Sequence, residues 1–428
     1  MPKPEKLMSG RVPTPMAHYT QAARVGDLIF LAGQIASDYK TGVPAELGRQ
    51  PGYEYYGSDI KDQTRYVLEN IGANLEDAGS DFDHVVKAQV FLLDSEDFNG
   101  FDEVWREFFR NPPPRTTVET GPKGLLVPGT RVEIDLIAVS KDAAEQPEAL
   151  SSDRVPKPLA NYTQATRWGD FLFLAGQVPS HFGEGGIAPE ARVDPAFPYY
   201  ASAIERQTKY TLDNLAALLE DIGSDLEHVV KAQVFLTDLN DFSEFDSVWK
   251  QYFPTPPPRT TLQIGRLLLE QALVEIDLIA VRQDGAIKPE VINTDSAPGP
   301  KANYSQAVVA GDLVFLAGQL ASDFQTGVAP EARVDPNFRF YGSEIESQTE
   351  YIIQQMQAVL EASGSSLDNI VKAQTFLTDL DDFYGYDKVW KRHFETPPPR
   401  TTIELAGDGL LVPGTLVEID VIAAREGG

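Results

Sequence analysis

An arginine and a glutamate recur three times along this chain, and they are the residues whose chemistry is most visible in the sequence. The arginine follows three prolines in the sextet PPPRTT, where it is Arg115, Arg259 and Arg400. Proline fixes φ and removes a backbone donor, so each guanidinium stands on a stiff corner. Such a guanidinium can bind a carboxylate through two parallel hydrogen bonds. It can equally form a structural ion pair with an acidic neighbour, and the residue alone leaves both interpretations open.

The glutamate belongs to the motif VEID, at Glu133, Glu275 and Glu418, and follows the arginine of its repeat by 18, 16 and 18 residues. In an alternating strand Glu133 and Asp135 share one face, and the apolar residues between them share the other. If the acidic face is covered, its carboxylates must be paired or functional; if it faces solvent, they are ordinary surface charges. We expect the arginine and the glutamate of one repeat to line one cleft, whose other wall comes from a neighbouring repeat.

Two further motifs accompany this pair. A tyrosine in Y-[TS]-Q-A is Tyr19, Tyr162 and Tyr304, and could be a pocket residue or a half-buried packing residue. A glycine inside an apolar strand, in the triplet AGQ, is Gly33, Gly176 and Gly318. A glycine there marks a bulge or a close backbone approach, for example to a ligand.

These motifs keep one period, because the arginines are 144 and 141 residues apart, the glutamates 142 and 143, and the tyrosines 143 and 142. The chain is therefore predicted to contain three tandem domains, each with its own core. We expect the repeats to span residues 1–141, 158–283 and 302–428, joined by connectors at 142–157 and 284–301 that are rich in Pro, Ser, Asp and Glu. The simplest interpretation is a homotrimer written into one polypeptide, with any subunit-boundary site lying between repeats.

Each repeat predicts the element order ββαβαββ, an α+β domain with helices on one face of a sheet. In repeat 1 a hairpin turns at Gly26-Asp27 and returns as LIFLAGQ. An amphipathic helix follows and ends near Gly79, where a left-handed cap belongs. The strand VVKAQVFL, a helix containing Trp105, and two strands that begin at PPPRTT and VEID complete the repeat.

Composition excludes several classes of function. Net charge is 36 − 64 = −28, which disfavours nucleic acid and anionic membranes as partners. No stretch is long and apolar enough for a signal peptide or a membrane helix. The chain has no cysteine, which excludes disulfides and thiol chemistry and fits a cytoplasmic protein. The five histidines form no spaced pair, so we expect neither a metal nor an organic cofactor.

Together these motifs resemble the RidA (YjgF) family; the residues that carry the resemblance are HYTQA, LAGQIASDYKTG, VVKAQVFLLD, PPPRTT and VEIDLIAV. The resemblance implies chorismate-mutase-like domains that form a pseudo-trimer, with sheets inside, helices outside and clefts between neighbours. It implies hydrolytic deamination of an enamine or imine on a small carboxylate. By the same resemblance the arginines hold the carboxylate, the glutamates handle water, and the tyrosines and glycines given above line the pocket.

The chain departs from the family pattern at several positions. Alanine replaces the serine before the glycine, at Ala32, Ala175 and Ala317. Threonine takes the pocket place that cysteine often has, at Thr117, Thr261 and Thr402, and aspartate replaces a pocket asparagine, at Asp102, Asp246 and Asp387. The loop before the first helix is more aromatic, with Tyr53, Tyr55 and Tyr56 and their counterparts Phe197, Tyr199, Tyr200, Phe338, Phe340 and Tyr341. We therefore expect a larger or aromatic-derived substrate.

Alternatives stay open at this point. One is a C–N hydrolase of a ring-cleavage product, similar to a 2-aminomuconate deaminase, and another is a non-catalytic module that binds a carboxylate metabolite. Cyanuric acid hydrolases and chorismatases also build rings from three related domains. The first group uses Ser-Lys pairs, but Lys87, Lys231 and Lys372 have no evident serine partner, so we interpret them as structural.

We expect a monomer, or a dimer of pseudo-trimers, whose three clefts are not equivalent. Repeats 1 and 3 contain GLLVPGT before the last strand, whereas repeat 2 has the shorter LLLEQA. Losing the Pro-Gly pair is expected to change the turn geometry of this hairpin. The cleft that uses the last hairpin of repeat 2, beside Glu275, is therefore predicted to be the weakest.

Overall fold

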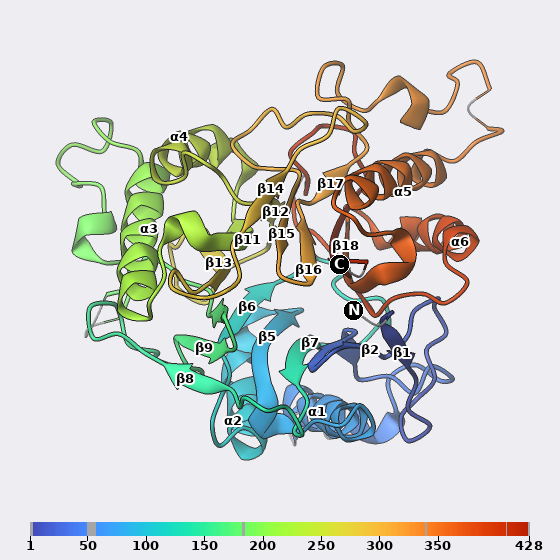
Figure 1. Ribbon diagram of the computed structural model, residues 1–428, viewed down its shortest axis with the longest axis horizontal. Helices are drawn as coiled ribbons and strands as arrows, with labels where there is room; N and C mark the ends of the chain where they lie inside the picture. The colour runs from blue at the N-terminus through green and yellow to red at the C-terminus, as the bar shows by residue number, and fades with distance from the viewer. Residues whose placement is uncertain (1–2, 49–56, 182–184, 339, 408, 427–428) are drawn as a thin grey trace.

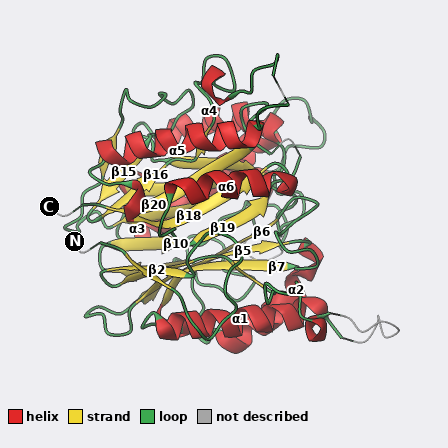
Figure 2. Cartoon of the chain, turned by 90° about the vertical axis from the view of Figure 1, so that its right-hand side faces the viewer, coloured by secondary structure: helices red, strands yellow, loops and turns green. Residues whose placement is uncertain are grey.

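A computed structural model describes residues 3–48, 57–181, 185–338, 340–407 and 409–426. The three repeats form three lobes around a common axis, and the helices lie on the outside while the strands face the centre (Figure 1). The side view shows the same layering, with helices flanking the strands (Figure 2). The predicted α+β pseudo-trimer, with sheets inside and helices outside, is confirmed.

Each repeat contributes one long and one shorter helix. Their bounds are α1 Asp59–Asp77, α2 Phe98–Phe108, α3 Ala203–Asp221, α4 Phe242–Tyr252, α5 Glu344–Ala362 and α6 Phe383–His393. No helix of the described residues combines the length and apolar character needed to cross a membrane.

The strands form three sheets. In each sheet one pair is parallel, namely β5 with β6, β11 with β12 and β18 with β19, and the remaining pairs are antiparallel. Their orders are β1-β2-β3-β7-β5-β6 with β4 on β7, β12-β11-β13-β10-β9-β8, and β14-β15-β16-β20-β18-β19 with β17 on β20. The bounds are β1 Glu5–Leu7, β2 Ala22–Val25, β3 Leu28–Leu31, β4 Gln34–Ile35, β5 Val85–Leu92, β6 Arg115–Glu119, β7 Val132–Val139, β8 Glu148–Leu150, β9 Ala165–Trp168, β10 Phe171–Leu174, β11 Val229–Leu236, β12 Arg259–Gln263, β13 Val274–Val281, β14 Glu290–Ile292, β15 Ala307–Ala310, β16 Leu313–Leu316, β17 Gln319–Leu320, β18 Ile370–Leu377, β19 Arg400–Glu404 and β20 Val417–Ala424.

Local sequence signals account for these elements. Gly26, Gly169 and Gly311 take positive φ in the hairpin turns, as do Gly79, Gly223 and Gly364 after the long helices. The backbone N–H groups of Glu205 and Glu346 donate to Ser202 and Ser343, which cap the N-termini of α3 and α5. Trp105, Trp249 and Trp390 are fully buried, one in the core of each repeat.

The segments expected to be connectors do more than join the repeats. Residues 148–150 form β8, which pairs with β9, and residues 290–292 form β14, which pairs with β15. Each strand is three residues long and lies at a sheet edge. Such short segments, surrounded by Pro and Asp, carry too little alternation to be recognised as strands from sequence.

The inner faces of the three sheets meet in layers. Two apolar clusters, one containing Phe30, Phe173 and Phe315 and the other Phe91, Phe235 and Phe376, each combine residues of all three repeats. Between them lies a polar layer around a cavity of about 30 Å³, lined by Lys87, Gln89, Asp135, Lys231, Gln233, Asp277, Lys372, Gln374 and Asp420. A volume of this size has room for one or two water molecules.

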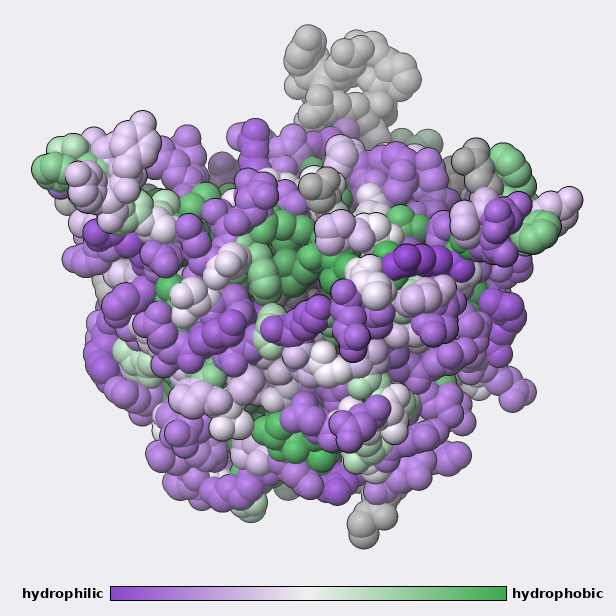
Figure 3. Space-filling view, turned by 90° about the horizontal axis from the view of Figure 1, so that it is seen from above, coloured by the Kyte–Doolittle hydropathy of each residue, from purple (hydrophilic) through white to green (hydrophobic). Residues whose placement is uncertain are grey.

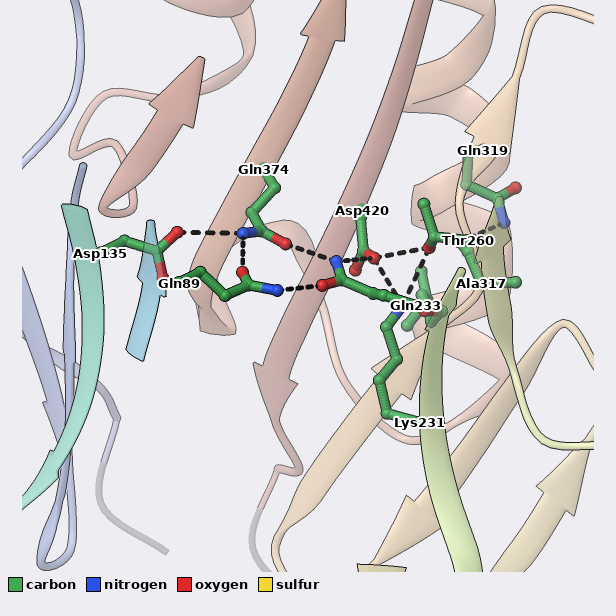
Figure 4. Close-up of polar contacts among 10 residues, drawn as sticks. Gln89, Asp135, Lys231, Gln233, Thr260, Ala317, Gln319, Gln374 and Asp420 are labelled. Atoms are coloured by element: carbon green, nitrogen blue, oxygen red, sulfur yellow. Dashed lines mark hydrogen bonds and ion pairs between the residues drawn. The ribbon is translucent and has the colours of Figure 1, made fainter. Parts of the chain in front are cut away.

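Three glutamines close a ring of hydrogen bonds in this polar layer (Figure 4). The Gln89 amide donates to Gln233, Gln233 donates to the Gln374 oxygen at 2.6 Å, and Gln374 donates back to Gln89. Each bond crosses from one repeat to the next. The amides therefore satisfy one another only when all three repeats are assembled.

Candidate active site at the repeat boundaries

Three clefts lie at the boundaries between repeats, and we name them cleft 1–2, cleft 2–3 and cleft 3–1 after the repeats that form them. All fifteen predicted site residues line these clefts, five to each. Cleft 1–2 contains Arg115, Thr117, Tyr162, Gly176 and Glu275; cleft 2–3 contains Arg259, Thr261, Tyr304, Gly318 and Glu418; cleft 3–1 contains Arg400, Thr402, Tyr19, Gly33 and Glu133.

One expectation about this arrangement is wrong: the arginine and glutamate of one cleft come from different repeats. Glu133 points to the inner face of its sheet, the same face as its strand neighbour Asp135. Arg115 points to the opposite, helix-covered face, where it pairs with Asp102 of α2. Linear spacing could not reveal this, because the two residues lie on different strands of the sheet. Cleft 3–1 thus joins Glu133 to Arg400, and the other clefts follow the same rule.

Each arginine is buried and held by its own repeat. Arg115 Nη2 donates to Asp102 Oδ1 at 2.9 Å, and Arg259 and Arg400 do the same to Asp246 and Asp387 at 2.9 and 3.0 Å. Aromatic rings surround the guanidinium, whose central carbon in Arg115 lies 5.1 Å from the Trp105 ring centroid. The arginine therefore forms the structural ion pair and also lines the cleft, and its binding of a carboxylate stays a prediction.

The ion pair does not occupy the whole guanidinium. Among the described residues, Nε and Nη1 of Arg400 have no hydrogen-bond partner, and neither has Nε of Arg115. A buried donor without a partner costs free energy unless a ligand or water satisfies it. These nitrogens are themselves buried, in residues that line clefts 3–1 and 1–2.

The glutamates are buried carboxyls with raised pKa values. Desolvation, followed by repulsion from Asp135, raises the pKa of Glu133 to about 8. Desolvation and the neighbouring Asp277 or Asp420 likewise raise the pKa of Glu275 and Glu418 to about 8. At neutral pH all three are predominantly protonated, and each can donate a proton or accept one after donating.

The aspartates of VEID have a different role from the glutamates two residues earlier. Asp277 pairs with Lys87 at 2.7 Å, Asp420 with Lys231 at 2.7 Å, and Asp135 with Lys372 at 2.5 Å. Every pair joins two repeats inside the central polar layer, in which Lys231, Asp420 and Thr260 can be followed in Figure 4. The acidic face is therefore covered; its aspartates are paired, and the lysines are structural as expected.

The tyrosines lie beside the arginine of each cleft: the guanidinium carbon of Arg400 is 5.8 Å from the Tyr19 ring centroid, and that of Arg115 is 5.9 Å from the Tyr162 ring centroid. Burial raises the pKa of Tyr19 and Tyr162 to about 12, so both phenols stay neutral and can donate hydrogen bonds. The Tyr19 hydroxyl lies 2.8 Å from that of Tyr39, a cleft residue that the motif comparison did not single out. The contrast between ASDYKTG in repeat 1 and ASDFQTG in repeat 3 is the sequence signal that could have identified it.

Other cleft residues were also missed. Phe98, Phe242 and Phe383, the first residues of the second helices, line clefts 1–2, 2–3 and 3–1. The exposed aromatic side chains expected near the site, such as Tyr199 and Tyr341, line none of these three clefts. Tyr53, Tyr55 and Tyr56 lie outside the described residues.

The last hairpin of repeat 2 keeps its turn, contrary to the expected change. Gln271 adopts φ 66°, where Gly129 and Gly414 adopt 89° and 87°. The Gln207 amide donates to the Gln271 carbonyl at 3.0 Å, as Gln63 does to Gly129. Leu268 and Leu269 line cleft 1–2, as Leu411 and Val412 line cleft 2–3 and Leu126 and Val127 line cleft 3–1. The cleft volumes differ: about 190 Å³ for cleft 1–2, 280 Å³ for cleft 2–3 and 510 Å³ for cleft 3–1.

Comparison with known proteins agrees with this architecture. A RutC family protein of Pyrococcus horikoshii is 41% identical over 137 residues, which are 32% of this chain and 98% of the relative. Reactive Intermediate Deaminase A of Arabidopsis thaliana, a chloroplastic protein, is 34% identical over 139 residues, 32% of this chain and 67% of that protein. A chorismatase structure superposes with a TM-score of 0.51 at 12% identity, over 80% of this chain and 93% of that one, which is a likeness of fold alone.

The family model described as Endoribonuclease L-PSP matches residues 9–140, 152–282 and 294–425. Its three matches follow the three lobes of the structure, and the second and third begin inside the segments expected to be connectors. The chain therefore belongs to the Endoribonuclease L-PSP family, together with its RutC and RidA relatives, and carries the domain in three tandem copies.

Proposed function

We propose that this chain is a hydrolytic deaminase acting on the C=N bond, or the tautomeric enamine, of a small carboxylate. The observation that carries the proposal is the convergence of a buried arginine and a protonated glutamate from adjacent repeats in each cleft. The arginine supplies directional donors for a carboxylate. The glutamate has a pKa close to physiological pH, which suits a group that gives and takes one proton in turn.

The proposed reaction can be followed in cleft 3–1. With the substrate carboxylate held by Arg400, the Glu133 carboxyl gives its proton to the imine nitrogen. Water adds to the imine carbon and returns a proton to Glu133, which yields a carbinolamine. Glu133 then protonates the amine, the C–N bond breaks and ammonia leaves, and the hydroxyl proton goes back to Glu133 as the keto acid forms. The sum is imine plus water giving ketone plus ammonia.

The description of the family model raises ribonuclease activity as a second candidate. The net charge of −28 disfavours binding of a phosphate backbone. A view onto one end of the molecule shows a mostly hydrophilic surface with small apolar areas between its polar residues (Figure 3). The buried arginine and glutamate that line each cleft favour a small carboxylate over RNA as the ligand.

The test is to generate enamines enzymatically from amino acids and to measure keto acid and ammonia release with and without the protein. The panel includes a small aminoacrylate-type enamine and an enamine derived from ring cleavage. We expect release to be faster than spontaneous hydrolysis and to be lost in the triple variant Glu133→Gln, Glu275→Gln, Glu418→Gln. Carboxylate binding without any acceleration, equal in the triple variant, would instead identify a metabolite-binding module.

A further inference from the structure

The three clefts share their arginine, glutamate and tyrosine, but cleft 3–1 contains a second tyrosine. Tyr39 lines this cleft, and its hydroxyl lies 2.8 Å from the Tyr19 hydroxyl. In cleft 2–3 the same loop position is Phe324, which has no hydroxyl to offer to Tyr304. The corresponding residue of cleft 1–2 is Phe182, which lies outside the described residues and by its chemistry lacks the group as well.

The loop that carries Tyr39 is built in the same way in repeats 1 and 3. Tyr39 and Phe324 both adopt φ 55°, a left-handed conformation that is uncommon for a bulky side chain. Their backbone N–H groups donate to Ser37 and Ser322, at 3.0 and 2.9 Å. The loop therefore fixes the aromatic ring in both clefts.

An aspartate stabilises each of these loops. Asp38 accepts from the N–H groups of Lys40 and Thr41 at 2.8 and 2.7 Å, and Asp323 accepts from Gln325 and Thr326 in the same way at 2.7 Å each. The two loops thus share their backbone hydrogen bonds. The cleft-lining side chains of the two loops differ at two positions: Tyr39 has a hydroxyl that Phe324 lacks, and Lys40 corresponds to a glutamine in repeat 3.

One of the two hydroxyl hydrogens of the Tyr19–Tyr39 pair is not needed for the hydrogen bond between them. When one phenol donates its hydrogen to the other, the second phenol still has a hydrogen that it can give to a ligand oxygen. Burial raises the pKa of both groups, so neither loses this hydrogen near neutral pH. Lys40 lines the same cleft and favours an acceptor that carries negative charge, whereas the neighbouring Lys391 is already paired with Asp387 at 2.8 Å.

Arg400 lines the same cleft, with its guanidinium carbon 5.8 Å from the Tyr19 ring centroid, and is the group that would hold the first carboxylate. The cleft volume of about 510 Å³ exceeds the 190 and 280 Å³ of the other two and is in the range typical of metabolite sites. A ligand that filled it could contact both the arginine and the tyrosine pair.

We propose that cleft 3–1 selects a substrate with two carboxylates, one bound by Arg400 and the second by the Tyr19–Tyr39 pair, and that Tyr39 is the specificity-determining residue. This inference rests on the proposed function, because it assumes that Arg400 holds the first carboxylate. Clefts 1–2 and 2–3, which lack the second hydroxyl, would accept monocarboxylates without this preference.

Keto acids, the products of the proposed reaction, are suitable probes because their binding can be measured without turnover. We would titrate the full chain with 2-oxobutanoate and with 2-oxoglutarate by calorimetry. The diacid is expected to show one tight site per chain. Tyr39→Phe should lower the ratio of diacid to monoacid affinity by roughly tenfold or more, the effect of losing a hydrogen bond to a charged group.

Phe324→Tyr is the converse variant and should create a second diacid site in cleft 2–3. Tyr200→Phe, at a side chain 86% exposed, is the matched control that should leave the affinity ratio unchanged. If Tyr39→Phe does not fold, the gain in stoichiometry with Phe324→Tyr still decides the question.

The inference is overturned if the diacid occupies three equivalent sites, or if Tyr39→Phe leaves the affinity ratio as it was and Phe324→Tyr adds no site. Normal monoacid binding in those experiments would leave the proposed function intact. Failure of both acids to bind the unmodified protein would instead count against the proposed function itself.

Discussion

The carboxylate of Glu133 lies directly against the backbone of Gly33, in the space that a side chain at this position would need. A Cβ atom at Gly33 would overlap the Glu133 oxygen Oε1, and the same holds for Gly176 with Glu275 and for Gly318 with Glu418. The glycine that sequence analysis interpreted as a site of close approach is thus approached by the glutamate. It allows this carboxyl to lie beside the cleft.

Replacing Gly33 by alanine should therefore move the Glu133 carboxyl out of its position. We expect the activity of cleft 3–1 to fall by about a hundredfold, since a shift on the order of 1 Å has effects of this size on catalysis. The measurement is keto acid release in a Glu275→Gln, Glu418→Gln background, in which only cleft 3–1 keeps its glutamate. Gly10→Ala is the control, because a Cβ there meets no atom within 4 Å. Unchanged activity in a folded Gly33→Ala protein would contradict the positioning role.

The three clefts should contribute unequally to turnover. Cleft 1–2 has the smallest volume of the three, about 190 Å³, and cleft 3–1 has the largest, about 510 Å³. We expect the single variant Glu275→Gln to lower the rate least and Glu133→Gln to lower it most. Glutamine keeps the shape of the side chain, so thermal melting should show that each variant is folded. Equal losses of about a third in all three variants would show equivalent clefts and reject this prediction.

Much of the fold and most of the site residues could be predicted from the sequence. Local features are predictable because they depend on residues that are close together in the sequence. Examples are the helix caps at Ser202 and Ser343 and the positive-φ glycines after the long helices. The fifteen site residues were identified because each occupies the same place in three copies of one motif. The three copies could be compared with one another and with the motifs of the family that the chain resembles.

What the sequence did not reveal depends on contacts between repeats. Arg400 and Glu133 line one cleft although they belong to the third and the first repeat, and this follows from the faces of two different sheets. The turn at Gln271 was misjudged because a long-range hydrogen bond from Gln207 holds a non-glycine residue at positive φ. The pairing of Tyr19 with Tyr39 likewise depends on a loop conformation rather than on a motif.

The activity should decrease as the pH rises through about 8. Burial and Asp135 raise the pKa of Glu133 to about 8, so the carboxyl is neutral below this pH and anionic above it. The proposed reaction begins with the protonated form, and kcat/KM should therefore be level below this value and fall about tenfold per pH unit above it. The profile can be recorded with the substrate panel from pH 6 to pH 10. A rate that rises through pH 8 would show that the ionised glutamate starts the reaction.

The ring of glutamines should contribute to the stability of the assembled repeats. Gln89→Leu removes the donor to Gln233 and the acceptor of Gln374, and it leaves the Gln233 oxygen buried without that hydrogen bond. We expect the free energy of unfolding to fall by about 1–3 kcal/mol, the usual cost of an unsatisfied buried group. Urea denaturation gives this quantity, and Gln354→Leu on the exposed side of α5 is the matched control. Equal stability of the two variants would mean that water replaces the lost bonds.

The chain should behave in solution as one pseudo-trimer, or as a dimer of pseudo-trimers, and not as a trimer of chains. The inner faces of its three sheets already cover one another, and the hydrogen bonds from Gln89 to Gln233, Gln374 and back to Gln89 close within one polypeptide. Three separate chains could form the same ring only by exchanging repeats. Light scattering coupled to gel filtration should give a mass of 47.1 kDa or twice that value. A particle containing three chains would show that repeats are exchanged between molecules, and each cleft would then join residues of two chains.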